Sequence, residues 1–458
     1  MPDTIAAIAT PQLPSAIGIL RLSGPDTRRI LDVVFSPAHG GPVSGQAPRR
    51  MVLGDLHDRQ GRIIDSALAV LFPGPHSYTG EDSAEFYCHG SPVVLRELLS
   101  ALFAAGARQA GPGEFTRRAF LNGRLDLTEA EAVVDLIDAE TAAAARNAAA
   151  QLHGALRRDF EAVTERLLDI TSRFYAVVDY PDEDIQDIQP QEIRQALRDC
   201  DATLSRLLDT CGRGRILKSG VRTAIIGRPN AGKSSLLNAL AGYERCLVTD
   251  IPGTTRDTVE ESVLCGGVRL RLIDTAGIRE TEDVVEKLGV ERSRRALEDA
   301  DLILAVVDGS AASTEEDEEI LRLASCCPRW ILVLNKQDLH PGRSTVYALS
   351  PSLPKPSAAV EVSALNGDVF SLERAVERLF PEGDIPDGSI LTNARQQEAA
   401  QRAREAVRRA LEALESGLTP DAVLTDAEEA LDALGELTGR TAREEIVQQI
   451  FSRFCVGK

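Results

Sequence analysis

The sequence has few of the features that mark membrane or secreted proteins. None of its apolar runs approaches the ~20 residues that a membrane-spanning helix needs. Its N-terminal segment lacks a basic stretch and is broken by prolines, so a signal peptide is not expected. Its eight cysteines include no C-x-x-C pair, which argues against a zinc site or a disulfide framework. We therefore expect a cytoplasmic protein without a membrane anchor.

Positive net charge is also absent, because the formal net charge of the chain is −19. Non-specific binding to nucleic acid depends on a high local density of Lys and Arg, so the chain is not expected to coat nucleic acid. A nucleic-acid substrate held by a local basic patch is still compatible with this composition. The apolar content of 43% and the charged content of 26% indicate a globular protein.

Composition divides the chain into four segments. Residues 1–122 contain the strand-like and helix-like runs of a small α/β domain, whereas residues 123–219 are rich in Ala, Leu, Glu and Arg and predict long helices. Residues 220–381 alternate strands with helices, as in a parallel α/β domain, and helical composition resumes over residues 382–458. The sequence thus predicts one helical domain that is split by an inserted α/β domain.

Two local features are predicted within these segments. Thr128 and Glu131 match the T-x-x-E pattern of a capping box at the start of a helix. Gly266-Gly267 joins two strand-like runs, which predicts an antiparallel hairpin.

The segment GRPNAGKS, residues 227–234, matches the G-x-x-x-x-G-K-[ST] pattern of a phosphate-binding loop. A strand-like run precedes it and a helix-like run follows it, which is the context that this motif requires. The glycines let backbone N–H groups surround a phosphate at a helix N-terminus. Lys233 is expected to contact the terminal phosphates, and Ser234 is expected to ligate Mg²⁺.

Further motifs follow in the order that a GTPase requires. The segment GTTRD (253–257) supplies Thr255 as the second Mg²⁺ ligand, and DTAG (274–277) closes a predicted strand. The carboxylate of Asp338 can accept from the N1–H and 2-amino groups of guanine, a pair of donors that adenine lacks. The sequence therefore predicts a GTP hydrolase. The residues expected to contact GTP are Asn230, Ala231, Gly232, Lys233, Ser234, Ser235, Thr249, Asp250, Ile251, Pro252, Gly253, Thr254, Thr255, Asp274, Thr275, Ala276, Gly277, Asn335, Lys336, Asp338, Ser363 and Ala364.

The glutamine that positions the attacking water in many small GTPases is missing. Ile278 occupies the position directly after DTAG, so another group must orient the water. The charged segment that follows offers Glu280, Glu282, Glu286 and Glu291, although residue type alone favours a solvated carboxylate for each of them. The side chain of Asn230 either braces the phosphate-binding loop or ligates a monovalent cation that would neutralise transition-state charge.

Taken together, the chain resembles the tRNA modification GTPases of the MnmE (TrmE) family over essentially its whole length. The resemblance is carried by a G domain inserted in helices, PGEFTRRAFLNGRLDLTEAEAV, DYPDED and the terminal FCVGK. It implies a mixed α/β and α fold. Residues 1–122 would be a folate-binding and dimerisation domain, 123–219 and 382–458 a discontinuous helical domain, and 220–381 an inserted Ras-like GTPase domain.

The family also implies a reaction. A homodimer would work with an FAD-dependent, NADH-using partner, MnmG, to place an aminomethyl-type group on C5 of the wobble uridine of tRNA. Potassium would promote G-domain dimerisation and hydrolysis, and Glu286 would orient the water. The implied Mg²⁺ ligands are Ser234 and Thr255, and the implied K⁺ ligands are Asn230, Thr249, Ile251 and Thr254.

Local basic groups could dock the tRNA, or they could simply be solvated. These candidates are Arg117, Arg118, Arg213, Arg215 and the helix face 402–409.

The same resemblance implies a site for 5-formyl- or methylene-tetrahydrofolate, the one-carbon donor. Its contacts would be Arg21, Glu85, Arg124 and Lys458. By residue type alone, Arg21 and Glu85 would be ordinary ion-pair residues. Cys455 is expected to take part in tRNA modification, either as a nucleophile or by packing and hydrogen bonding.

Two other interpretations are weaker. A ribosome-assembly GTPase that binds rRNA would share the G-domain motifs but usually carries a basic appendage, which this acidic chain lacks. A prenylated GTPase would explain Cys455, yet Gly457 and Lys458 are atypical of a lipidation box and no polybasic segment precedes it.

Overall fold

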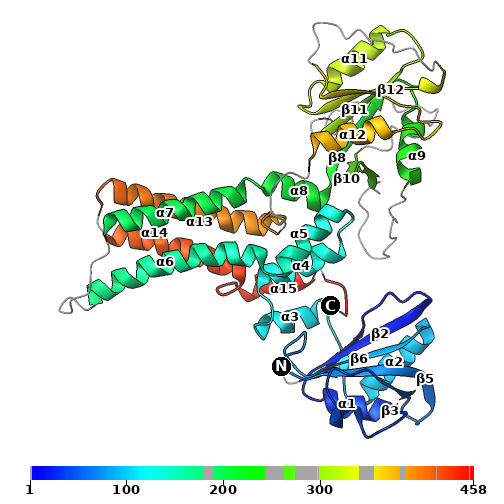
Figure 1. Ribbon diagram of the computed structural model, residues 1–458, viewed down its shortest axis with the longest axis vertical. Helices are drawn as coiled ribbons and strands as arrows, with labels where there is room; N and C mark the ends of the chain where they lie inside the picture. The colour runs from blue at the N-terminus through cyan, green and yellow to red at the C-terminus, as the bar shows by residue number, and fades with distance from the viewer. Residues whose placement is uncertain are drawn as a thin grey trace. The chain divides into compact units, whose positions relative to one another are not determined.

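The structure is a computed structural model that describes residues 3–179, 189–243, 262–273, 297, 299–339, 355–381, 388–418, 420–452 and 454–457 (Figure 1). The chain forms two compact units. The first comprises residues 1–134, 149–206 and 398–458, and the second comprises residues 135–148 and 207–397. The domain boundaries predicted after residues 122, 219 and 381 stay predictions.

A seven-stranded sheet forms the N-terminal part of the first unit, in the order β3-β4-β5-β6-β2-β1-β7. Its neighbouring strands are antiparallel except for β1 and β7. Along β6, Phe86 and Cys88 are buried in the core, whereas Glu85 and Tyr87 point to the other face because side chains alternate along a strand. The elements are β1 (Ile5–Ile8), β2 (Ser15–Ser23), α1 (Thr27–Val34), β3 (Phe35–Pro37), η1 (Val43–Gly45), β4 (Val52–His57), β5 (Ile63–Phe72), β6 (Ser83–Gly90), α2 (Pro92–Ala104) and β7 (Arg108–Gln109).

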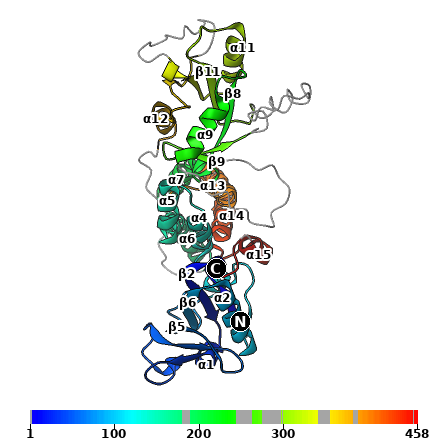
Figure 2. The ribbon, with the colours of Figure 1, turned by 90° about the vertical axis from the view of Figure 1, so that its right-hand side faces the viewer.

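Helices make up most of the remaining first unit. Four long helices, α6, α7, α13 and α14, lie side by side in both views (Figures 1 and 2). Arg404 and Arg408 of α13 each lie 3.0 Å from the carboxylate of Asp201 on α7, so ion pairs supplement the apolar packing between these helices. The helices are α3 (Glu114–Leu121), α4 (Leu127–Ile137), α6 (Ala155–Asp179), α7 (Pro190–Leu208), α13 (Ala394–Glu415), α14 (Pro420–Thr438) and α15 (Glu444–Ser452).

The cap of α4 differs from the prediction. Asp126 accepts from the backbone N–H of Glu129 at 2.8 Å, and Glu129 accepts from the backbone N–H of Asp126 at the same distance. This reciprocal pair is a capping box two residues before the predicted one. The prediction of a Thr128–Glu131 box was wrong because Thr128 already lies inside the helix, where its hydroxyl donates to Asp126.

The second unit contains a six-stranded sheet in the order β13-β12-β11-β8-β10-β9, parallel except for the hairpin β9–β10. The predicted hairpin is confirmed, with Gly266 and Gly267 at φ values of 59° and 76° in its turn. Apolar side chains cover both faces of the sheet. The elements are α5 (Ala142–Leu152), α8 (Cys211–Ser219), β8 (Val221–Gly227), α9 (Lys233–Tyr243), β9 (Ser262–Cys265), β10 (Val268–Leu272), β11 (Leu302–Asp308), α11 (Glu315–Ala324), β12 (Trp330–Asn335), η3 (Gln337–Leu339), β13 (Ala358–Glu361) and α12 (Phe370–Leu379).

This arrangement is the mixed α/β and α fold that the sequence predicts. In the part of the chain that the structure describes, no helix has the length and apolar character needed to cross a bilayer.

Candidate GTP-binding site and N-terminal pocket

The phosphate-binding loop connects the end of β8 to the start of α9. Asn230 and Gly232 have φ values of 62° and 95°, which turn the backbone so that its N–H groups converge at the helix N-terminus. Lys233 donates from Nζ to the carbonyl oxygens of Gly227 and Arg228, both at 2.9 Å. The ammonium group is therefore held inside the loop, where a phosphate would meet both the helix dipole and a positive charge.

The loop after β12 is attached directly to the phosphate-binding loop. Asn335 is 2% exposed and donates from Nδ2 to the carbonyl oxygen of Ala231 at 3.0 Å, while its Oδ1 accepts from the backbone N–H of Ala364 at 3.1 Å. A Cβ atom at Gly232 would lie 2.1 Å from Asn335 Nδ2, so only glycine fits there. One buried amide thus joins three of the predicted nucleotide-binding segments.

The side chains expected to recognise the guanine base are held in place by a hydrogen bond and an ion pair. Ser363 Oγ donates to Asp338 Oδ1 at 2.7 Å, which sets the orientation of the carboxylate. Lys336, at a φ of 65°, lies with Nζ 2.7 Å from Asp308 Oδ2. Burial raises the pKa of Asp308, but hydrogen bonds from Lys336 and Ser310 outweigh it and hold that pKa below its ordinary value. Asp308 was not among the predicted residues, although its position at the end of the strand LILAVVD signals it.

Several predicted residues lie outside the described part of the chain, and their roles stay predictions. They are Thr249, Asp250, Ile251, Pro252, Gly253, Thr254, Thr255, Asp274, Thr275, Ala276, Gly277, Glu286 and Lys458. Ser234 and Ser235 lie in the first turn of α9, beside Lys233.

In the N-terminal sheet, Arg21 of β2 and Glu85 of β6 are cross-strand neighbours. Arg21 Nε donates to Glu85 Oε1 at 2.8 Å, and the hydroxyl of Tyr87 donates to Glu85 Oε2 at 2.5 Å. Burial and the hydrogen bond to Glu85 raise the pKa of Tyr87 to about 12, so it keeps its proton at neutral pH. The guanidinium of Arg21 also lies 5.8 Å from the centre of the Tyr78 ring.

Arg21, Tyr78 and Glu85 line a cavity of about 110 Å³, which also borders Phe72 and Phe115. Arg124 is exposed and is not among the residues lining this cavity. Its side chain lies beside Gly80, which follows the lining residue Thr79 in the sequence. The structure therefore brings Arg21 and Glu85 together and leaves Arg124 at the edge of the neighbouring loop.

The C-terminal segment reaches this pocket. Val456 forms an antiparallel bridge with Pro112, and the N–H of Gly113 donates to the carbonyl oxygen of Cys455 at 3.4 Å. Arg21 Nη1 lies 3.5 Å from the carbonyl oxygen of Gly457. Gly457 has a φ of 102°, and a Cβ atom there would lie 2.5 Å from a backbone oxygen of Ile8. The side chain of Cys455 is exposed at the same place.

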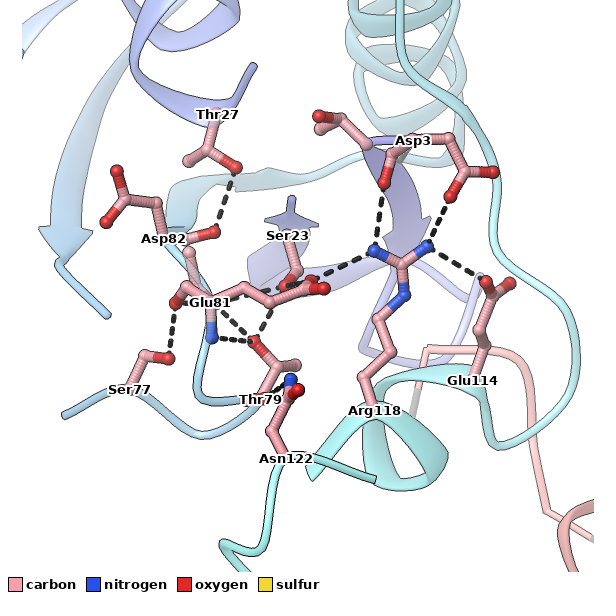
Figure 3. Close-up of polar contacts among 12 residues, drawn as sticks. Asp3, Ser23, Thr27, Ser77, Thr79, Glu81, Asp82, Glu114, Arg118 and Asn122 are labelled. Atoms are coloured by element: carbon pink, nitrogen blue, oxygen red, sulfur yellow. Dashed lines mark hydrogen bonds and ion pairs between the residues drawn. The ribbon is translucent and has the colours of Figure 1, made fainter. Parts of the chain in front are cut away.

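Arg118 does not face solvent, which contradicts both alternatives left open for it, a tRNA-docking group and a solvated side chain. Its side chain is 0% exposed and lies among three acidic residues (Figure 3). Nη1 donates to Glu81 at 2.9 Å, and Nη2 donates to Asp3 and Glu114 at 3.0 and 3.1 Å. Glu114 also accepts from Arg108. The GEFTRR segment thus ties α3 to the start of β1 and to the loop before β6.

The helix face 402–409 is neutralised by neighbouring carboxylates. Arg404 and Arg408 pair with Asp201, Arg402 pairs with Glu436, and Arg409 lies 2.9 Å from Asp426. Most of the positive charge on this face is therefore already compensated. The ion pairs support neither of the two open interpretations, tRNA docking or plain solvation.

A phosphate-binding loop at the end of a parallel strand, joined to an N-K-x-D loop and a Ser-Ala loop, defines a GTPase. Two family models cover nearly the whole chain: "GTP-binding protein TrmE N-terminus" matches residues 4–124, and "MnmE helical domain" matches residues 127–455. The chain belongs to the MnmE family of tRNA modification GTPases.

Curated relatives agree along the full length. The tRNA modification GTPases MnmE of Heliobacterium modesticaldum and of a Roseiflexus species are each 45% identical, and that of Symbiobacterium thermophilum is 46% identical; each comparison covers 100% of this chain and 99% of the relative. Among solved structures, Era in complex with MgGDPNP and a part of 16S ribosomal RNA is 29% identical over 41% of this chain and 66% of its own, with a TM-score of only 0.28.

Proposed function

We propose that this GTPase acts in the cytoplasm on the wobble uridine of tRNA, as a homodimer that works with the FAD-dependent protein MnmG in a hetero-oligomer. The observation that carries the proposal is that one chain of the MnmE family holds two separate sites. One is the guanine-type nucleotide site around Asn335, and the other is the Arg21–Glu85 pocket where Cys455–Gly457 docks. GTP hydrolysis would drive the conformational change that accompanies addition of an aminomethyl or carboxymethylaminomethyl group.

In the nucleotide site, Lys233 and the backbone N–H groups would bind the phosphates, and Asp338 would select guanine. Ser234 and Thr255 would hold Mg²⁺, which offsets charge on the phosphate oxygens. Asn230 has an exposed side chain on the phosphate-binding loop, so its carbonyl oxygen is available to a K⁺ ion together with Thr249, Ile251 and Thr254. Glu286 would orient the attacking water.

In the N-terminal pocket, Glu85 offers a carboxylate to N–H donors, and Arg21 offers a positive charge. These are the groups that a tetrahydrofolate derivative needs, and Arg124 and Lys458 would add positive charge at the edge. The cavity of about 110 Å³ is small beside the ~300–1,000 Å³ of typical ligand pockets. The homodimer that the family resemblance implies would let a second copy of the chain complete the enclosure.

The function is tested by mass spectrometry of wobble nucleosides in tRNA from a strain that lacks this gene. We expect the C5-modified uridines to disappear and to return when the gene is supplied. Unchanged modification in the deletion strain would refute the proposal. Cys455→Ser should lose modification and keep GTP hydrolysis.

The mechanism of hydrolysis is tested separately. GTP hydrolysis should be faster in potassium chloride than in sodium chloride, and Glu286→Ala should be slow in both. Equal rates in the two salts, or full activity of Glu286→Ala, would contradict the potassium and glutamate roles.

A further inference from the structure

The second unit holds a cavity of about 730 Å³ bordered by α5, α8, the β9–β10 hairpin and α12. Arginine is its dominant polar residue. Among the described residues that line it, one is acidic, Glu377. The lining arginines are Arg213, Arg215, Arg269, Arg329, Arg374 and Arg378.

Half of these arginines are compensated by nearby carboxylates. Arg215 lies 2.8 Å from Asp301, Arg269 lies 2.9 Å from Glu140, and Arg374 lies 3.3 Å from Glu377. If these three arginine–carboxylate pairs were its only charges, the cavity wall would have a net charge close to zero.

The other three are not compensated. Arg213, Arg329 and Arg378 have no carboxylate partner among the residues that the structure describes. The guanidinium of Arg329 lies 5.2 Å from the ring centre of Phe380, so its flat face is supported while its N–H edge is free to donate. The cavity therefore has an excess of positive charge.

This excess is unusual for the chain, whose net charge is −19. On the 402–409 helix face, the arginines of α13 are matched by acidic neighbours, as described above. In a concave wall of low dielectric constant, uncompensated charges of one sign reinforce each other and attract counter-charges. Guanidinium groups suit phosphate oxygens in particular, because their planar N–H donors can bind two oxygens at once.

Close packing and hydrogen bonds hold the hairpin side of the cavity. A Cβ atom at Gly266 would lie 2.3 Å from the carbonyl oxygen of Glu373, so the hairpin turn packs directly against α12. Arg269 is fixed by Glu140 and by the hydroxyl of Ser262. Charges contributed by α8, α12 and the segment before β12 therefore surround a space wider than a single phosphate needs.

We propose that this arginine-lined cavity binds the phosphate backbone of the RNA substrate. The inference rests on the proposed function, which makes tRNA that substrate, and it adds the surface where the backbone docks. The contacts are made to phosphates rather than to bases, so binding depends on salt and little on sequence.

The test uses the full chain and a fluorescently labelled, unmodified tRNA transcript. The main variant combines Arg213→Gln, Arg329→Gln and Arg378→Gln. The matched control combines Arg50→Gln, Arg59→Gln and Arg443→Gln, which removes the same charge from exposed arginines elsewhere that also lack a carboxylate partner among the described residues. Thermal unfolding of each protein checks that both variants are folded.

In fluorescence anisotropy at several salt concentrations, the main variant should bind at least about tenfold more weakly than the control near 0.1 M salt. The slope of log Kd against log salt should fall by about 2 to 3, roughly one for each lost phosphate contact. A third variant with lysine at the same three positions should keep most of the affinity, because it keeps the charge.

The outcomes separate the two claims. If the main variant and the control bind equally, the cavity is not the docking surface, and the proposed function is unaffected. If the unaltered chain does not bind tRNA at all, both the docking surface and tRNA as the substrate are refuted.

Discussion

Asn335 Nδ2 donates to the carbonyl oxygen of Ala231 at 3.0 Å, which joins the end of β12 to the predicted phosphate-binding loop. The oxygen of the same amide accepts from Ala364 at 3.1 Å. Because Asn335 is 2% exposed, water cannot replace either hydrogen bond. The spacing between the segments predicted to hold the base and the phosphates thus relies on this side chain.

Replacing Asn335 by alanine should weaken both nucleotide binding and folding. Two buried backbone groups would lose their partners, at a cost of about 1–3 kcal/mol each. Binding of a fluorescent GDP analogue and thermal unfolding measure the two effects. Asn366→Ala, at an exposed position in the neighbouring turn, is the control. Equal behaviour of the two variants would show that the amide is not a structural link.

Asp338→Asn should change the base preference from guanine to xanthine. The carboxylate would accept from two N–H donors of guanine, whereas an amide presents one acceptor and one donor, which match the N1–H and the 2-oxo group of xanthine. Losing charge-assisted hydrogen bonds worth about 1.5–3 kcal/mol each should reduce GTP hydrolysis at least tenfold. Rates with GTP and XTP measure the change. Ser363→Ala, which removes only the support of the carboxylate, should reduce GTP hydrolysis less and create no preference for XTP.

Arg118→Met should destabilise the first unit by about 3–5 kcal/mol, because it removes the buried arginine that pairs with Glu81 and one of the two arginines that pair with Asp3 and Glu114. Arg117→Met is the matched control. Its side chain is 28% exposed and pairs with the exposed Glu444, a kind of ion pair worth about 0–1 kcal/mol. Urea unfolding followed by circular dichroism compares the two, and similar stabilities would contradict a structural role for Arg118.

Acid should weaken the contact between β7 and α3. The hydrogen bond from Arg108 lowers the pKa of Asp3; burial raises the pKa of Glu114, but hydrogen bonds from Arg108, Gly111 and Arg118 outweigh it. A lowered pKa stabilises the folded state above the ordinary values of 3.8 and 4.5, and this contribution is lost as pH falls through the lower folded values.

The difference in unfolding free energy between the unaltered chain and Arg108→Gln isolates this effect. It should be constant from pH 7 to about 5 and should shrink below the ordinary carboxylate range. The comparison is needed because burial raises the pKa of Asp126 and of Glu129, which contribute with the opposite sign. A difference that does not change with pH would contradict the assignment.

Cys455 should react with iodoacetamide in the native protein, because its side chain is exposed. Three buried cysteines should not react: burial raises the pKa of Cys88 to about 11 and those of Cys200 and Cys265 to about 12, so they carry almost no thiolate at neutral pH. Peptide mass spectrometry after brief labelling distinguishes them. If Cys88 were labelled before Cys455, the C-terminal segment around Cys455 would be shielded from the reagent, contrary to this prediction.

The sequence predicts local features well and distant contacts poorly. The phosphate-binding loop and the Gly266-Gly267 hairpin were predictable because a few adjacent residues determine their backbone. The role of Arg118 was not predictable, because its ion-pair partners Asp3 and Glu81 are distant in sequence. Its neighbour Arg117 is partly exposed, so residue type alone does not distinguish the two arginines. The capping box was misplaced by two residues because Asp126 and Thr128 are both good caps, and only the hydrogen bonds distinguish them.

The bridge between Pro112 and Val456 also sets an order of assembly during protein synthesis. A ribosome makes the N-terminal sheet first and the segment 455–457 hundreds of residues later, after the whole nucleotide site has emerged. Because domains fold as they leave the ribosome, the GTP site can be complete while Arg21 still lacks its contact with Gly457. A nascent chain would therefore be able to bind nucleotide before the C-terminal segment docks at its second pocket.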